Sequence, residues 1–392
     1  MAQNDGLDAT TDSQAIHREF GVDGEFIDVE REKVTISVNE PYDPDRIDVA
    51  TRTPTINLML SRILRGKIDL QPDFQRNAGI WNGANQSRLI ESMLLRIPLP
   101  AFYAAENPDD SWAIVDGIQR LTAIARFMAP DSVSFPPLKL KGLNYLDFDG
   151  CRFEDLPGHL QTRLEETEIV LHLIRAGTPE NAKFNIFARI NTGGLPLTTQ
   201  ELRHALIPGV ARRILAELAQ NAEFQAATSN SVAGSRMADR EMALRFIAFL
   251  MVDPEKYLER DFDSFLRESM KEINSLDTET LSDIQSRFSK AMRAAQDIFG
   301  IYAFRKQYQQ EAGRFPINKA LFEVIGVSLA RRTGQQIDRL IEKRLQVSSG
   351  FIDLMNSDVR FDQAISVGTG DPAKVRYRFK AIDELLAKYD RS

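Results

Sequence analysis

The sequence predicts an α+β fold in which a mixed domain precedes an all-helical one. Two observations lead to this prediction. Before residue 200, β-rich runs such as AFYAAE, SWAIV and EIVLHLI alternate with segments of helical periodicity. Beyond residue 200, apolar residues recur almost throughout at helical spacing. We therefore divide the chain into an acidic segment expected to be flexible (1–40), an α+β domain (41–200) and a helical domain (201–392).

The composition is that of a globular protein. The chain has 392 residues, of which 43% are hydrophobic and 27% charged, enough for two domains of ordinary size. A single cysteine, Cys151, excludes an internal disulfide framework and a cysteine-rich zinc site. No run approaches the roughly 18 apolar residues that span a bilayer, and no signal peptide is apparent. We expect a soluble, cytoplasmic protein.

The charge is unevenly distributed. The first 50 residues contain 13 acidic and 4 basic side chains, whereas the remainder contains 43 acidic and 45 basic ones. One interpretation is a solvated, partly disordered tail. The other is a nucleic-acid mimic that lies over a basic groove. The nearly neutral body does not indicate DNA binding, which usually leaves a basic patch, but composition does not exclude it.

Two amphipathic helices are expected before the first long strands, and order is expected to begin near residue 34. The first helix lies within TINLMLSRILRGKI at 55–68, with Gly66 as its expected end, and an irregular loop over 71–81 follows it. The second helix is stopped by the prolines of IPLP at 97–100. The expected buried positions are Ile56, Leu60, Ile63 and Leu64 in the first helix, and Leu89, Met93 and Ile97 in the second.

The next segment predicts a β-hairpin that leads directly into a helix. The runs AFYAAE and SWAIV are strands, and the turn between them is Asn107–Asp110. The helix is GIQRLTAIARFM at 117–128. Its expected buried residues are Leu121, Ile124, Ala125 and Met128.

Later elements follow from caps and periodicity. Residues 131–160 indicate loop with short strands, and 165–177 indicate a β-rich run. A helix is expected to be capped by Thr178 and closed at 193–194 by glycines, and Thr198 and Glu201 have the spacing of a capping box. In the helical domain, one stripe keeps the helical period over Ile284, Phe288, Met292, Ala295 and Phe299.

The junction at IVDGIQRLTAI is the strongest candidate for chemistry. Gly117 would let the backbone approach a ligand, and free N–H groups of the helix start would face it. Arg120 could grip a phosphate with two hydrogen bonds, and Asp116 could hold a metal or orient a water. The alternative is structural, with Asp116 as the helix N-cap and Arg120 paired with a nearby carboxylate.

Two other segments are weaker candidates. The INTGG stretch is either a glycine C-cap or a second polar loop with Asn191 and Thr192 as ligand donors. Arg76 in the loop PDFQR is either a plain exposed arginine or part of the same site. The four histidines lack metal-ligand spacing, and no GxxxxGK[ST], GxSxG or HExxH motif is present.

The four segments PDFQR…W…LIESMLLRIPLP, IVDGIQRLTAI, IFARINTGGLPLTTQELRHAL and RMADREMALRFIAF occur together and in order. In this combination the chain resembles the N-terminal domain of GmrSD-type restriction systems. The resemblance covers roughly residues 55–250, with weaker similarity at 315–323. It implies a ParB/sulfiredoxin-like fold for the N-terminal domain and a motif usually written D-G-Q-Q-R.

The resemblance also implies a function and a set of site residues. In the family, the motif supports binding and hydrolysis of a nucleoside triphosphate, with Mg²⁺ as the expected cofactor. The implied catalytic residues are Asp116, Gln119 and Arg120, with Asp116 also as metal ligand. The implied nucleotide-binding residues are Arg76, Gly117, Arg120, Asn191, Thr192 and Gly193.

Departures from the family pattern limit what is carried over. Ile118 replaces the first glutamine of the motif, so we expect binding and leave hydrolysis open. The chain has only His204 after residue 172, which is too few histidines for the His-Asn-His nuclease domain of full-length members. The sulfiredoxin reaction needs a cysteine at the position of Ile118 and is excluded.

The leading hypothesis is therefore a nucleotide-responsive module of bacterial defence against foreign DNA, whose nuclease is a separate partner protein. The first alternative is a non-enzymatic, ParB-like DNA-binding protein in which the motif holds a nucleotide or a DNA phosphate. A second alternative is a toxin-like nuclease that uses carboxylates alone. The sequence leaves the identity of the nucleotide, the DNA ligand and the oligomeric state open.

Overall fold

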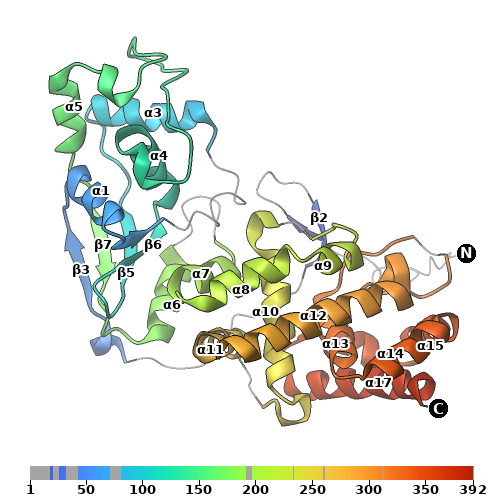
Figure 1. Cartoon of the computed structure of the whole chain (residues 1–392). Helices are drawn as coiled ribbons and strands as arrows, with labels where there is room; N and C mark the ends of the chain where they lie inside the picture. Colours follow the sequence, from blue (N-terminus) through green and yellow to red (C-terminus); the bar gives the residue numbers. More distant parts are fainter. Residues whose placement is uncertain are drawn as a thin grey trace, which may run out of the picture. The chain divides into compact units, whose positions relative to one another are not determined.

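The computed structural model describes residues 18–20, 26–31, 43–70, 81–190, 197–232, 234–258, 261–311 and 313–391. The chain forms two compact units (Figure 1). The sheet unit comprises Val38–Pro208 and the short segment Ser235–Met237. The helical unit comprises Met1–Ser37, Gly209–Gly234 and Ala238–Ser392. An α+β fold followed by a helical region is thus confirmed, while the units change over at 208 rather than at 200.

The sheet unit is built on a five-stranded mixed sheet with the order β3-β7-β5-β6-β4. The strands β5 and β6 form the predicted antiparallel hairpin, and β4 runs parallel to β6 at the edge. Because β6 is buried at four of its five positions, it lies within the core rather than on a wet face. The strands are β3 Val49–Arg52, β4 Ile68–Asp69, β5 Phe102–Glu106, β6 Trp112–Asp116 and β7 Leu171–Ile174.

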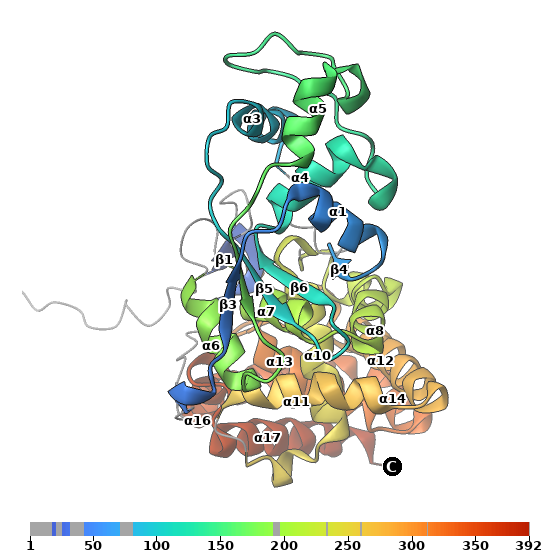
Figure 2. The same ribbon diagram turned by 90° about the vertical axis from the view of Figure 1, so that its left-hand side faces the viewer.

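Helices complete the core of the sheet unit. Helices α1, α3, α4 and α5 pack on one another, and α7 packs beside both α6 and β6 (Figure 2). The apolar faces of α1, α3, α4 and α5 join β4, β5, β6 and β7 in one hydrophobic cluster. The helices are α1 Ile56–Leu64, α3 Gly83–Leu94, α4 Ile118–Met128, α5 Gly158–Glu165, α6 Glu180–Ile190 and α7 Thr199–Leu206.

Most elements of this unit agree with the prediction, and three details differ. Leu64 is 62% exposed because it is the last residue of α1 and turns away from the face of Ile56 and Ile63. Ile97 follows the end of α3 and is 50% exposed. Helix α5 occupies residues expected to be loop or strand; only Leu164 of it is buried, so its sequence carries little periodicity.

The described part of the helical unit consists mainly of helices. The stripe predicted on α12 is confirmed, since all five of its apolar residues are buried. The helices are α8 Val210–Ala219, α9 Ala222–Ala227, α10 Ala238–Met251, α11 Phe262–Ser275, α12 Thr278–Phe299, α13 Lys319–Ala330, α14 Gly334–Glu342, α15 Arg344–Ser357, α16 Val359–Ser366 and α17 Pro372–Asp390. No helix in the described ranges is both long enough and apolar enough to cross a bilayer.

The N-terminal segment contributes strands to the helical unit, β1 Arg18–Phe20 and β2 Phe26–Glu30. The expectation that order begins near residue 34 is therefore wrong for these residues. Two carboxylates hold β2 in place: Asp28 pairs with Arg305 at 2.8 Å, and Glu30 pairs with Lys306 at 2.9 Å. The acidic charge that suggested a solvated tail is in these positions neutralised by buried cations.

Candidate functional site

The candidate site lies where β6 leads into α4. The strand ends at Asp116, Gly117 has φ 95° and ψ 5°, and α4 begins at Ile118. The predicted strand, tight turn and helix are confirmed. Glycine is required here twice over, because its φ is left-handed and because a Cβ would lie 2.3 Å from Cδ1 of Phe102. The close backbone approach in this structure is thus to a phenylalanine ring on β5.

The first turn of α4 has no side-chain cap. Gly117 occupies the N-cap position, and no side chain accepts a hydrogen bond from the N–H groups that follow it. The alternative in which Asp116 is the N-cap is therefore wrong. Asp116 is the last residue of β6, and its carboxylate points to Arg120 instead. The helix start keeps amide donors that suit an anion.

Arg120 is held by the protein itself. Its Nη2 donates to Oδ2 of Asp116 at 3.1 Å and to the carbonyl oxygen of Ala101 at 3.1 Å, and its Nη1 donates to the carbonyl oxygen of Pro100. The guanidinium also lies 4.4 Å from the ring centre of Phe102. Burial lowers the pKa of Arg120, and the neighbouring Asp116 carboxylate opposes that effect. The predicted pairing of Arg120 with a carboxylate is confirmed.

Three side chains at the junction differ in their exposure to solvent. The side chain of Asp116 is 45% exposed, so one carboxylate at the junction reaches solvent while it holds Arg120. Gln119 is partly exposed on the same helical turn. Ile118 is 6% exposed and belongs to the hydrophobic core of the unit. An apolar residue at this position of the motif therefore serves packing.

Arg76, Asn191, Thr192 and Gly193 lie outside the described residues, and so do the glycines expected to close α6. Their convergence with Asp116 stays a prediction. Of the described elements next to them, β4, which precedes residue 76, pairs with the first two residues of β6, and α7, which follows residue 193, packs beside β6. Thr178 does not cap in the described contacts; its hydroxyl bonds to the backbone of Asp48.

A buried ion pair in the sheet unit escaped the sequence analysis. Both carboxylate oxygens of Glu201 accept hydrogen bonds from Arg236, each at 3.1 Å. Glu201 also completes the predicted capping box with Thr198, which is confirmed. The sequence analysis named the segment that contains Arg236 only as part of the family resemblance. The pair itself has no local signal, since 35 residues separate its two members.

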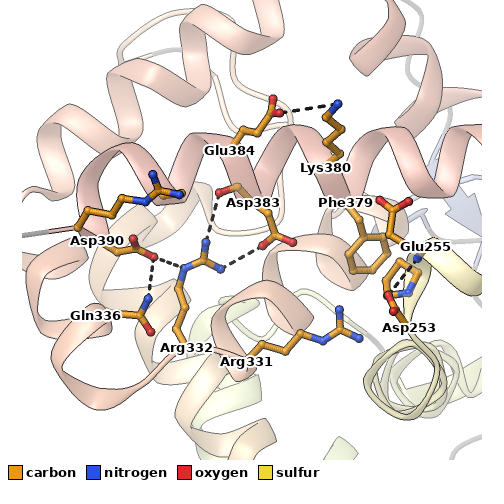
Figure 3. Close-up of a pocket in the computed structure, with 13 residues that line it drawn as sticks. Asp253, Glu255, Arg331, Arg332, Gln336, Phe379, Lys380, Asp383, Glu384 and Asp390 are labelled. Atoms are coloured by element: carbon orange, nitrogen blue, oxygen red, sulfur yellow. Dashed lines mark hydrogen bonds and ion pairs between the residues drawn. The ribbon is translucent and has the colours of Figure 1, made fainter.

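A pocket of about 550 Å³ in the helical unit is lined by none of the predicted site residues (Figure 3). Arg332 donates to Asp390 at 2.7 Å and to Asp383 at 3.1 Å, and Lys380 lies 3.9 Å from Glu384. The lining contains four basic and five acidic side chains. Because these charges largely pair with one another, the pocket does not favour an anion such as a nucleotide.

The comparison with known families agrees with the resemblance noted above. A family model described as "GmrSD restriction endonuclease, N-terminal domain" matches residues 56–208. This range ends where the sheet unit changes over to the helical unit. No curated protein matches the chain. Residues 56–208 thus relate the chain to restriction systems.

Proposed function

We propose, from the premise that residues 56–208 belong to the GmrSD restriction endonuclease N-terminal domain family, that the sheet unit binds a nucleoside triphosphate where β6 meets α4. The protein would act as the nucleotide-responsive module of a restriction system. The observation that carries this proposal is the uncapped first turn of α4, directly after a left-handed glycine and beside a half-exposed carboxylate. Strand-to-helix junctions of this kind bind phosphate through backbone N–H groups.

Each residue at the junction has a role in this proposal. The amides of the first turn of α4 would donate to phosphate oxygens. Asp116 would position the attacking water or bind a metal ion, and Gln119 would orient that water. Arg120 would hold Asp116 in place, because its guanidinium is already bonded to Asp116 and two carbonyl oxygens. A direct grip of Arg120 on phosphate would require it to leave these partners.

The residues fit Mg²⁺ only as an ion held mainly by the nucleotide. Among the described residues, no group of three or more His, Cys, Asp or Glu side chains is placed to hold a metal. Mg²⁺ commonly keeps several waters and takes one or two carboxylates in addition to phosphates, which Asp116 alone can satisfy. When bound, the ion would neutralise part of the phosphate charge.

Isothermal titration of the full chain with ATP, GTP and CTP, with and without Mg²⁺, tests the proposal. We expect one of them to bind, and Asp116→Ala to keep most of the Mg²⁺-free affinity while it loses any phosphate release. Asp131→Ala removes an exposed carboxylate elsewhere in the sheet unit and serves as the matched control.

The nucleotide titrations, together with a titration of the chain with duplex DNA, distinguish this proposal from the DNA-binding alternative. If the chain binds none of the three nucleotides, the proposal is wrong. If it binds duplex DNA instead, with an affinity that falls steeply as salt rises, the ParB-like alternative holds. Nucleotide binding in a small site should depend less on salt.

A further inference from the structure

The segment Ser235–Met237 belongs to the sheet unit although the residues on both sides of it belong to the helical unit. We propose that Arg236 in this segment is a positioning residue that connects the β6–α4 junction to helix α10 of the helical unit. This inference rests on the nucleotide site proposed above, because nucleotide binding at that site is the event that Arg236 would transmit to α10.

The first part of the connection is the ion pair of Arg236 with Glu201. The side chains of Arg236 and Glu201 are 12% and 2% exposed, and the two hydrogen bonds run from Nε to one carboxylate oxygen and from Nη2 to the other. Thr198 adds a bond from its hydroxyl to the carbonyl oxygen of Arg236 at 3.3 Å. A guanidinium fork bound in this way fixes an orientation as well as a distance.

The second part is the first turn of α7, in which Glu201 is the third residue. The carboxylate of Glu201 accepts the N–H of Thr198 at 2.5 Å, and Thr198 in turn accepts the N–H of Glu201 at 3.1 Å. Arg236 thereby holds the first turn of α7. Since α7 packs beside β6, whose last residue is Asp116, a displacement at the junction reaches the ion pair through packed backbone.

The third part is α10, which begins at Ala238, two residues after Arg236. Within the helical unit, α10 is tied to α13 by charged groups that are almost fully buried. Arg245 of α10 bonds Glu241 at 2.7 Å and Glu323 of α13 at 2.7 Å, and Arg378 of α17 bonds the second oxygen of Glu323. Buried, charge-assisted hydrogen bonds of this kind resist bending, so we expect α10 to move as a body when its first turn is displaced.

Hydrogen–deuterium exchange of the full chain tests this connection, with an equimolar mixture of ATP, GTP and CTP plus Mg²⁺ as the probe. In the wild type we expect exchange to slow at 112–128 and to change at 238–251. In Arg236→Ala we expect the response at 112–128 to persist within about threefold, and the response at 238–251 to disappear. Arg236→Lys keeps the positive charge but lacks the forked guanidinium, so we expect it to restore part of the response at 238–251.

Arg213→Ala is the matched control, because it removes an exposed ion pair with Glu217 on α8. It should leave both responses intact. Circular dichroism checks that each variant is folded. An α10 response that survives in Arg236→Ala, or a wild type that responds at 112–128 alone, overturns the inference and leaves the nucleotide site standing. A wild type that responds at neither segment overturns both.

Discussion

Replacing Arg120 with alanine should destabilise the sheet unit more than replacing its partner Asp116. The side chain of Arg120 is 10% exposed, whereas that of Asp116 is 45% exposed. Arg120→Ala leaves the carbonyl oxygens of Pro100 and Ala101 without this donor and removes the contact with Phe102. Pro100 is exposed and Ala101 half-buried, so water can replace part of these hydrogen bonds, and we expect a loss of about 1–3 kcal/mol. Asp116→Ala should cost less than about 1 kcal/mol, as half-exposed ion pairs do.

Tryptophan fluorescence measures this loss selectively. The chain has two tryptophans, Trp81 and Trp112, and both lie in the sheet unit. With a urea m value of roughly 2 kcal/mol/M, the midpoint of the fluorescence transition should fall by about 0.5–1.5 M in Arg120→Ala. Arg152→Ala removes an exposed ion pair with Glu154 in the same unit and should leave the midpoint unchanged.

The reasoning about Arg120 fails if the midpoint of Arg120→Ala stays within about 0.3 M of the wild type. It also fails if Asp116→Ala proves the more destabilising of the two. In either case the two carbonyl bonds do not hold the junction together. Arg120 would then be free for the direct phosphate contact that the sequence suggested.

Further variants test other parts of the structure. Gly117→Ala should lower the fluorescence midpoint by an amount equivalent to about 2–4 kcal/mol, because it adds left-handed strain to a clash with Phe102; an unchanged midpoint would contradict the turn. Glu91 is desolvated, but hydrogen bonds from three backbone N–H groups of the loop after Lys141 outweigh this, so its pKa lies below the usual 4.5. A depressed pKa contributes stability above the unfolded value that is lost as pH falls through the folded one. The midpoint of the wild type should therefore drop below pH 4.5, and that of Glu91→Gln should change less. Glu30→Ala leaves the buried Lys306 without its carboxylate and should lower the melting temperature followed by circular dichroism, whereas the tryptophan midpoint should stay constant.

Patterns within a few residues predicted much of the fold. The turn of the hairpin, the glycine turn and the capping box at Thr198 each depend on backbone or capping bonds between residues fewer than six positions apart, and each was found where expected. The predictions failed where periodicity is weak. Helix α5 buries only Leu164, so nothing in its sequence separates it from a loop.

The candidate site was predictable in position but not in its bonding. The sequence indicated a junction at Asp116 and Gly117, and it left open whether Arg120 faces a ligand or a carboxylate. The structure places the guanidinium on Asp116 and on the carbonyl oxygens of residues 100 and 101. Those carbonyls precede β5, and only the pairing of β5 with β6 brings them under the first turn of α4.

Local sequence patterns predicted the order of most elements, the position of the turn at Gly117 and the family of residues 56–208. These properties are carried by short motifs, in which backbone preferences and neighbouring side chains act over one or two turns. Only the tertiary structure decided the partners of the long charged side chains. Arg236 reaches Glu201, and Asp28 reaches Arg305, across 35 and 277 positions of sequence. A guanidinium can form hydrogen bonds with any carboxylate that packing brings close enough. Its partner is therefore determined when distant segments of the chain pack together and bury the pair.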